Sequence, residues 1–130
     1  MDDIPGGRLR KIRQEKKLTV RDVSLMTGLT EATIMNIETG KTVPSLSSLR
    51  TLSEYLDIPI YYLGCFEDLP ERTLGERMRK ARMYHGFTKK EISELLEVDV
   101  KTLYNWESDA CKPYSHYMQS INSILKKLER

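Results

Sequence analysis

Residues 18–44 decide the fold, and they read LTVRDVSLMTGLTEATIMNIETGKTVP. Thr19 stands three residues before Asp22, the spacing at which a hydroxyl and an acidic side chain cap the start of a helix. Gly28 tolerates the left-handed backbone of a tight turn, and Thr30 is placed to cap the next helix. The stretch therefore predicts two short helices joined by a turn.

Helices are also predicted on both sides of this stretch. Upstream, Leu9 and Ile12 form the apolar side of an amphipathic helix of about residues 6–16. Downstream, Ser45 caps a fourth helix whose leucines recur at spacings of three and four residues: Leu46, Leu49, Leu52 and Leu56. The first part of the chain is thus predicted to consist of short helices around one apolar core.

The same pattern returns later in the chain, where residues 87–113 read FTKKEISELLEVDVKTLYNWESDACKP. With no gap, Arg13, Thr19, Asn36, Glu38 and Pro44 align with Arg82, Thr88, Asn105, Glu107 and Pro113. A repeat at a constant offset indicates one supersecondary unit used twice. We therefore predict two small domains, residues 1–63 and 73–130, joined by a linker at residues 64–72.

Capping signals recur in the second unit as well. Thr73 with Glu76, and Thr88 with Glu91, have the capping-box spacing, and Asp99 is placed to cap the third helix. A fourth helix is predicted over about residues 114–128, with a buried stripe of Tyr117, Met118, Ile121, Ile124, Leu125 and Leu128.

The composition excludes several classes of protein. With 39% hydrophobic and 31% charged residues, the chain has the composition of a soluble protein rather than of a disordered or membrane protein. Its longest weakly polar run, residues 58–66, is far shorter than the ~20 residues that cross a bilayer. The acidic start of the chain lacks the apolar core of a secretory signal. We therefore expect a cytoplasmic protein without membrane contact.

No set of residues in the sequence predicts catalysis or metal binding. Cys65 and Cys111 have no Cys/His neighbours at metal-ligand spacing, and His85 and His116 are isolated. Paired carboxylates, a nucleophile with its base, and a phosphate-binding loop are all missing from the pattern. We expect no enzyme activity, no cofactor, no metal and no small-molecule substrate.

The charge is divided between the two halves of the chain. Residues 1–69 hold nine Lys and Arg against ten Asp and Glu, whereas residues 70–130 hold twelve against nine. Because neither half is strongly basic, any contact with nucleic acid must depend on a local basic face.

One string in the first unit is long and specific: Leu18-Thr19-x-x-x-Val23-Ser24 … Gly28-Leu29-Thr30-x-x-Thr33-Ile34-x-x-Ile37-Glu38-x-Gly40-Lys41-x-x-Pro44. It closely resembles the Cro/lambda-repressor-like (XRE-type) helix-turn-helix DNA-binding domain. The resemblance covers about residues 6–63 and, more weakly, 73–128, where Glu97 and Asp109 replace the turn and loop glycines. It implies an all-α fold of two tandem lambda-repressor-like helix-turn-helix domains with four to five short helices each, residues 57–63 being the fifth helix of the first.

The resemblance also implies a DNA-binding surface, because in that family the third helix lies in the major groove. Here the third helices are about residues 30–38 and 99–107. The positions that map onto base contacts are Glu31, Ala32, Met35 and Asn36 in the first unit, and Val100, Lys101, Tyr104 and Asn105 in the second. Their chemistry suits base edges, since Asn pairs with adenine, Lys with guanine, Glu with cytosine, and Ala or Val with the thymine methyl. The alternative is that they are ordinary solvent-facing residues.

Candidate phosphate contacts flank the third helices: Arg10, Thr19, Lys41, Arg79, Thr88, Lys89 and Lys90. At Thr19 and Thr88 a helix begins, where backbone amides and the helix dipole favour an anion. Family members often carry Gln at the next position, where this chain has Val20 and Lys89. We therefore expect the second unit to contribute more of the salt-dependent affinity. For any one basic residue, an ordinary solvated charge is the alternative.

Two further groups of residues are assigned to structure. The resemblance implies partly buried ion pairs between the first and third helices, Arg13 with Glu38 and Arg82 with Glu107. Trp106 takes the place of Ile37 and is expected in the core. Packing between the two units is predicted for Tyr61, Tyr62, Leu63, Phe66 and Leu69.

The sequence thus predicts a sequence-specific DNA-binding transcriptional regulator, a repressor, whose partner is double-stranded DNA. A monomer that uses both third helices would read a non-palindromic site, whereas a homodimer formed through one unit would read a palindrome. The alternative is a protein-interaction module, such as an antitoxin-like protein in which one helix-turn-helix binds a protein partner. Val20, Glu31 and the near-neutral first half favour this alternative for the first unit.

Overall fold

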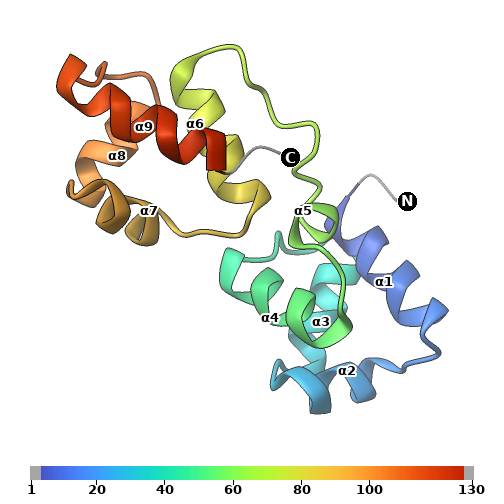
Figure 1. The fold of residues 1–130 in the computed structure, drawn as a ribbon. Helices are drawn as coiled ribbons and strands as arrows, with labels where there is room; N and C mark the ends of the chain where they lie inside the picture. The colour runs from blue at the N-terminus through green and yellow to red at the C-terminus, as the bar shows by residue number, and fades with distance from the viewer. Residues whose placement is uncertain (1–3, 128–130) are drawn as a thin grey trace. The chain divides into compact units, whose positions relative to one another are not determined.

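The computed structural model describes residues 4–127, and all regular elements in that range are α-helices (Figure 1). The chain divides into two compact units, Met1–Glu67 and Asp68–Arg130. The all-α fold class predicted from the sequence is therefore confirmed for the described part of the chain.

Within residues 4–67 the first unit contains α1 (Pro5–Glu15), α2 (Val20–Thr27), α3 (Glu31–Glu38), α4 (Leu46–Leu56) and α5 (Ile60–Leu63). Side-chain caps fix where α2, α3 and α4 begin. Thr19, Thr30 and Ser45 each accept a hydrogen bond from the backbone amide three residues further on. At Thr19 the Asp22 carboxylate accepts a bond from the Thr19 amide, which completes a capping box.

These helices pack around one apolar core. Both α1 and α2 pack on α3, α4 packs on α2, and α5 packs on α1 and α4. The most deeply buried side chains come from all five helices and include Leu9, Val23, Ile34, Leu52, Leu56 and Leu63.

A close approach of two backbones joins the first and third helices in each unit. The first turn of α1 lies so near α3 that a Cβ atom on Gly6 would collide with the backbone carbonyl of Ile37. Gly75 makes the same close approach to the carbonyl of Trp106 in the second unit. Only glycine fits at these two positions without a shift of the backbone.

Within residues 68–127 the second unit contains α6 (Leu74–Tyr84), α7 (Lys89–Leu96), α8 (Val100–Glu107) and α9 (Ser115–Lys127). In the alignment that places Thr19 on Thr88, the bounds of α6, α7 and α8 coincide with those of α1, α2 and α3, and α9 begins where α4 begins. The two predicted capping boxes, Thr73 with Glu76 and Thr88 with Glu91, are confirmed, and Asp99 caps α8.

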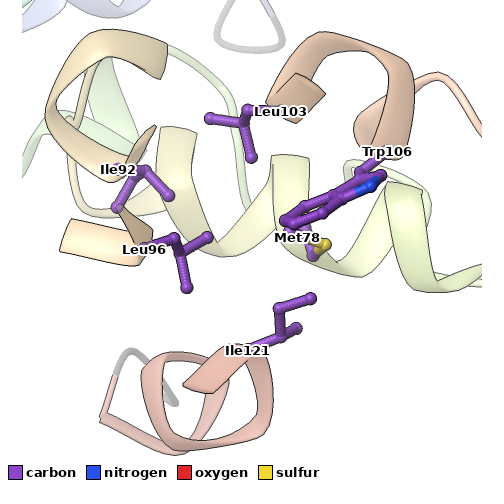
Figure 2. Packing of buried hydrophobic residues seen from close by; sticks show 6 residues of the cluster. All are labelled: Met78, Ile92, Leu96, Leu103, Trp106 and Ile121. Atoms are coloured by element: carbon purple, nitrogen blue, oxygen red, sulfur yellow. The ribbon is translucent and has the colours of Figure 1, made fainter. Parts of the chain in front are cut away.

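The core of the second unit draws one or two side chains from each helix: Met78, Ile92, Leu96, Leu103, Trp106 and Ile121 (Figure 2). The expected core position of Trp106 is confirmed, because only 5% of it is exposed.

The predicted stripe of α9 is less buried than expected. Among its described members only Ile121 is buried; Tyr117, Met118, Ile124 and Leu125 are partly covered, and Leu128 lies outside the described residues. The helix packs on α6 and α7, and its partly covered side chains lie against the edge of the core.

The two units share three left-handed turn positions. These are Lys17, Gly28 and Gly40 in the first unit, with φ of 59°, 78° and 78°, and Gly86, Glu97 and Asp109 in the second, with φ of 78°, 58° and 62°. Glu97 and Asp109 thus keep the turn and loop conformations without glycine.

Candidate nucleic-acid interface

An ion pair ties α1 to the end of α3. Arg13 Nε lies 2.7 Å from Glu38 Oε2, and Arg13 Nη2 donates to Glu38 Oε1 at 2.9 Å. Its third nitrogen, Nη1, donates to the Leu18 carbonyl at 2.9 Å, just before α2 begins. The hydrogen bond to Glu38 raises the pKa of Arg13 above its ordinary value. One guanidinium therefore fixes the third helix and the start of the second helix to the first.

The second unit repeats this arrangement. Arg82 Nε lies 2.8 Å from Glu107 Oε2, Nη2 donates to Glu107 Oε1 at 3.0 Å, and Nη1 donates to the Phe87 carbonyl at 3.0 Å. The Arg82 and Glu107 side chains are 7% and 3% exposed, so the pair is buried. The structure thus brings both predicted Arg–Glu pairs together, and in each pair the guanidinium fork also reaches a backbone carbonyl.

The turn between α2 and α3 is held by side-chain hydroxyls. Ser24 Oγ donates to the Leu29 carbonyl at 2.6 Å. Thr27 Oγ1 donates to the Val23 carbonyl and accepts from the Leu29 amide. Two of these bonds pair the amide and the carbonyl of Leu29 in the turn, and they help to fix the orientation of α3 relative to α2.

The candidate base-reading residues lie on the side of each third helix that faces away from the core. In α3, Ile34 and Ile37 are buried, whereas Glu31, Ala32 and Met35 are exposed. In α8, Val100, Lys101 and Tyr104 are exposed in the same way. Asn36 and Asn105 are half-buried, so each asparagine is more covered than its three neighbours on the outward side.

The helix starts expected to contact phosphate are closed by capping boxes. The backbone amides of Thr19 and Thr88 donate to Asp22 Oδ2 and Glu91 Oε1, both at 2.8 Å, so the capping boxes already use them. In the first unit this bond lowers the pKa of Asp22. The two threonine hydroxyls accept bonds in the caps, and a hydroxyl that accepts keeps its own proton to donate. The amides of these two threonines are therefore already paired, whereas each hydroxyl keeps a proton to donate.

The basic candidates differ in their surroundings. Arg10 lies with Nε 3.3 Å from Glu38 Oε1 but remains 49% exposed at its side chain. Lys41, Arg79 and Lys90 are exposed, and Lys89 is half-buried.

Lys89 also contacts one of the candidate base-reading residues. Its Nζ lies 5.1 Å from the centroid of the Tyr104 ring, which joins the start of α7 to the outward side of α8. The sequence pattern assigns each residue a separate role and does not pair them.

Arg8 makes a second set of contacts that the sequence pattern does not single out. Its Nη1 donates to the Tyr62 carbonyl at 2.7 Å, and its guanidinium carbon lies 4.5 Å from the Tyr62 ring centroid. Its Nη2 lies 2.5 Å from Glu67 Oε1. Arg8 therefore holds α5 and the segment after it on α1, within the first unit.

The residues predicted to pack between the units fall into two groups. Leu63 and Phe66 are buried, and Tyr61, Tyr62 and Leu69 are half-buried. The contacts of Tyr62 with Arg8 belong to the first unit, and the role of the set between the units stays a prediction.

The described part of the chain contains no group of three or more His, Cys, Asp or Glu side chains placed to hold a metal ion. Over the same residues, no helix has the length and apolar character needed to cross a membrane. Cys65 and Cys111 form no disulfide within the described part of the chain.

Comparison with known proteins finds a similarity in the first unit. Residues 6–64 match the family model described as helix-turn-helix domain. The chain is similar to the HTH-type transcriptional repressor RghR of Bacillus subtilis (strain 168), with 35% identity over 89 residues, which are 61% of this chain and 66% of that protein. It is also similar to the uncharacterized HTH-type transcriptional regulator RghRB of the same organism, with 36% identity over 55 residues, 42% of this chain and 40% of that protein.

The matched parts span less than two thirds of either relative. The resemblance seen in the sequence over about residues 6–63 is confirmed by the match over residues 6–64. Residues 6–64 are therefore similar to the helix-turn-helix domain whose family model they match.

Proposed function

We propose that this protein is a cytoplasmic DNA-binding transcriptional regulator that acts as a repressor, by binding and not by catalysis. The observation that carries the proposal is the outward side of α3, an exposed helix face in a helix-turn-helix domain, which the Arg13–Glu38 pair ties to α1. The names of both similar proteins, a transcriptional repressor and a transcriptional regulator, support it.

In this proposal α3 lies in the major groove of double-stranded DNA. Glu31, Ala32, Met35 and Asn36 then face base edges, where Asn36 would bond to adenine and Ala32 would contact a thymine methyl. Arg10, Lys41 and the Thr19 hydroxyl would contact phosphates on either side of the helix and set its register.

We propose that the second unit is a second helix-turn-helix domain. The recurrence of helix bounds, capping boxes and the buried Arg–Glu pair supports this assignment. The helix α8 would then present Val100, Lys101 and Asn105 to a second half-site, and Tyr104 lies on the same side. Its phosphate contacts would be Arg79, Lys89, Lys90 and the Thr88 hydroxyl.

The domain boundaries proposed are residues 1–63 and 73–130, with residues 64–72 as the linker. Tyr61, Tyr62, Leu63, Phe66 and Leu69 would pack between the units and set the spacing of the two half-sites. A monomer would then read a non-palindromic operator, and a homodimer formed through one unit would read a palindrome.

One observation favours a second function for the first unit, the binding of a protein partner. Leu25, Met35 and Val43 are 74%, 54% and 89% exposed, so their apolar side chains are accessible to a partner protein. An antitoxin-like or regulator-binding role would use such residues in place of DNA contacts.

A salt titration separates the two functions. Binding of a labelled duplex by the full chain is measured by fluorescence anisotropy over a range of salt concentrations. DNA binding predicts that log K falls linearly with log salt, by about 0.9 for each phosphate contacted. A slope near zero, or no binding at low salt, would contradict DNA binding and leave the protein-partner function.

A further inference from the structure

The second unit pairs a lysine on its second helix with a tyrosine on its third. Lys89 is the first residue of α7, and its Nζ lies 5.1 Å from the centroid of the Tyr104 ring in α8. Tyr104 is 55% exposed, so the pair lies on the outward surface of the unit. An ammonium within about 6 Å of an aromatic face is attracted by the ring quadrupole. The ring therefore holds the ammonium at the start of α7, beside the proposed DNA-facing side of α8.

A lysine loses side-chain entropy when it contacts a phosphate. Its charge sits at the end of a flexible stem, and a phosphate contact must order that stem. An ammonium already held over a ring has lost part of this freedom before DNA arrives, so less is lost on binding. The same contact leaves one face of the Tyr104 ring covered by Lys89, and that face is not available to a base.

The first unit has no such pair at the equivalent positions. Val20 and Met35 align with Lys89 and Tyr104 in the repeat, and neither is charged or aromatic. The two units have equivalent helix bounds here, so the difference lies in the side chains and not in the backbone. The pairing is thus a property of the second unit among the described residues.

We propose that Tyr104 is a positioning residue, whose ring holds the Lys89 ammonium for a phosphate contact, and that it does not read a base. The inference rests on the proposed function, since it requires the second unit to bind duplex DNA. In this inference Tyr104 increases the affinity for DNA of any sequence and does not help to recognise one sequence.

A double-mutant cycle on the full chain tests this. The variants are Lys89→Gln, Tyr104→Leu, the two combined, and Tyr104→Phe, each titrated with the same labelled duplex and with one of scrambled sequence. Tyr104→Leu should weaken binding to both duplexes alike, by ~2- to 5-fold. It should have no further effect in the Lys89→Gln background. Tyr104→Phe keeps the ring and should bind as the wild type does.

Lys90→Gln is the matched control, because Lys90 is the neighbouring lysine on the same helix. The losses of binding free energy caused by Lys90→Gln and by Tyr104→Leu should add in the double variant. A measurement without DNA checks the contact itself. The ring current of Tyr104 should shift the Lys89 ε-methylene protons upfield in the NMR spectrum, and the shift should vanish in Tyr104→Leu and persist in Tyr104→Phe.

Two results separate failure of this inference from failure of the proposed function. If the wild type binds duplex DNA but Tyr104→Leu and Lys89→Gln act additively, or Tyr104→Leu changes the preferred sequence, the positioning role is wrong and DNA binding stands. If the wild type shows no salt-dependent binding to either duplex, the proposed function is wrong and this inference falls with it.

Discussion

Arg13 and Arg82 each use their guanidinium fork to reach a glutamate and a backbone carbonyl at once. A lysine cannot replace either arginine, because its single ammonium lacks the planar set of donors that spans both partners. The glutamates are nearly inaccessible to water, with 3% of each side chain exposed. The pairs therefore act on stability, and through it on the placement of the third helices.

Glu38→Ala should destabilise the protein strongly. Removing the carboxylate leaves the Arg13 charge without its partner in a mostly buried site, and we expect a loss of roughly 3–5 kcal/mol in the free energy of unfolding. Thermal unfolding followed by circular dichroism measures it. Glu31→Ala, which removes an exposed carboxylate from the same helix, is the control and should change the melting temperature little. Unchanged melting of Glu38→Ala together with lost DNA binding would contradict the structural role.

Glu97 and Asp109, the two non-glycine residues at the turns of the second unit, should respond differently to substitution by glycine. Glu97 is exposed in a left-handed conformation, which costs an L-residue roughly 1–2 kcal/mol. Glycine removes that cost but adds chain entropy in the unfolded state, so Glu97→Gly should stabilise the protein by about 0.5–1 kcal/mol.

Asp109→Gly should not stabilise the protein, although Asp109 has the same backbone conformation. Its Oδ2 accepts from Thr73 Oγ1 at 2.6 Å and its Oδ1 accepts from the Gly75 amide at 3.2 Å, so its carboxylate caps the start of α6. Chemical denaturation measures the free energy of unfolding of Glu97→Gly and of Asp109→Gly and so checks both predictions. Equal stabilisation by both substitutions would show that the Asp109 carboxylate contributes nothing.

Among the helices, α1 is the element that organises the first unit. It contacts α3 through Arg13 and Gly6, and through Arg8 it holds α5 and the segment after it. The Arg8–Glu67 contact fixes the chain at the point where the first unit ends.

The Arg8–Glu67 contact should also make stability depend on pH. The hydrogen bond from Arg8 lowers the pKa of Glu67 in the folded protein, so the unfolded chain binds the proton more tightly. The stability that the contact contributes is therefore fully present above the ordinary glutamate pKa of 4.5 and is lost as the pH falls through the lowered value. Glu67→Gln should flatten this part of the stability–pH curve, and Arg8→Ala should flatten it similarly. If Glu67→Gln lost stability at acid pH as steeply as the wild type does, the contribution of the Arg8–Glu67 contact would be refuted.

The helices were predictable because their signals are local. Each capping pair, of Thr19, Thr73 or Thr88 with an acidic residue, lies within four consecutive residues. The turn glycine and the spacing of the apolar residues are also visible within short stretches of the sequence. The outward side of the third helices follows from the same spacing. Contacts that need the folded chain were not predictable: Arg8 meets Tyr62 across 54 residues and Asp109 meets Thr73 across 36. The partial burial of α9 also depends on packing, which periodicity does not measure.

Over the whole molecule, the two units share a pattern of helices and differ in surface charge. Lys89, Lys101 and Lys112 stand where the first unit has Val20, Ala32 and Val43. We therefore expect DNA binding by the second unit to weaken more steeply with salt than DNA binding by the first unit. The first unit should make more of its contacts with a binding partner through apolar side chains.

Limited proteolysis should report on the connection between the units. If the set from Tyr61 to Leu69 packs between them, the peptide bonds after Glu67 and Asp68 should resist a glutamyl endopeptidase in the native protein. Arg8→Ala removes a contact of the Glu67 carboxylate within the first unit, so it should speed cleavage after Glu67 and is the control for protection that does not come from packing between the units. Rapid cleavage of the wild type into two separately folded halves would contradict packing between the units.

Whether the outward sides of the third helices read DNA sequence can be decided by selection from a randomised duplex pool. The wild type, Asn36→Ala and Asn105→Ala are each used to enrich bound duplexes, which are then sequenced. The wild type should enrich a defined motif, and each substitution should relax the preference at one set of positions, since a lost bidentate contact to adenine costs about 1–3 kcal/mol of discrimination. If the wild type enriches no motif, the third helices do not read sequence.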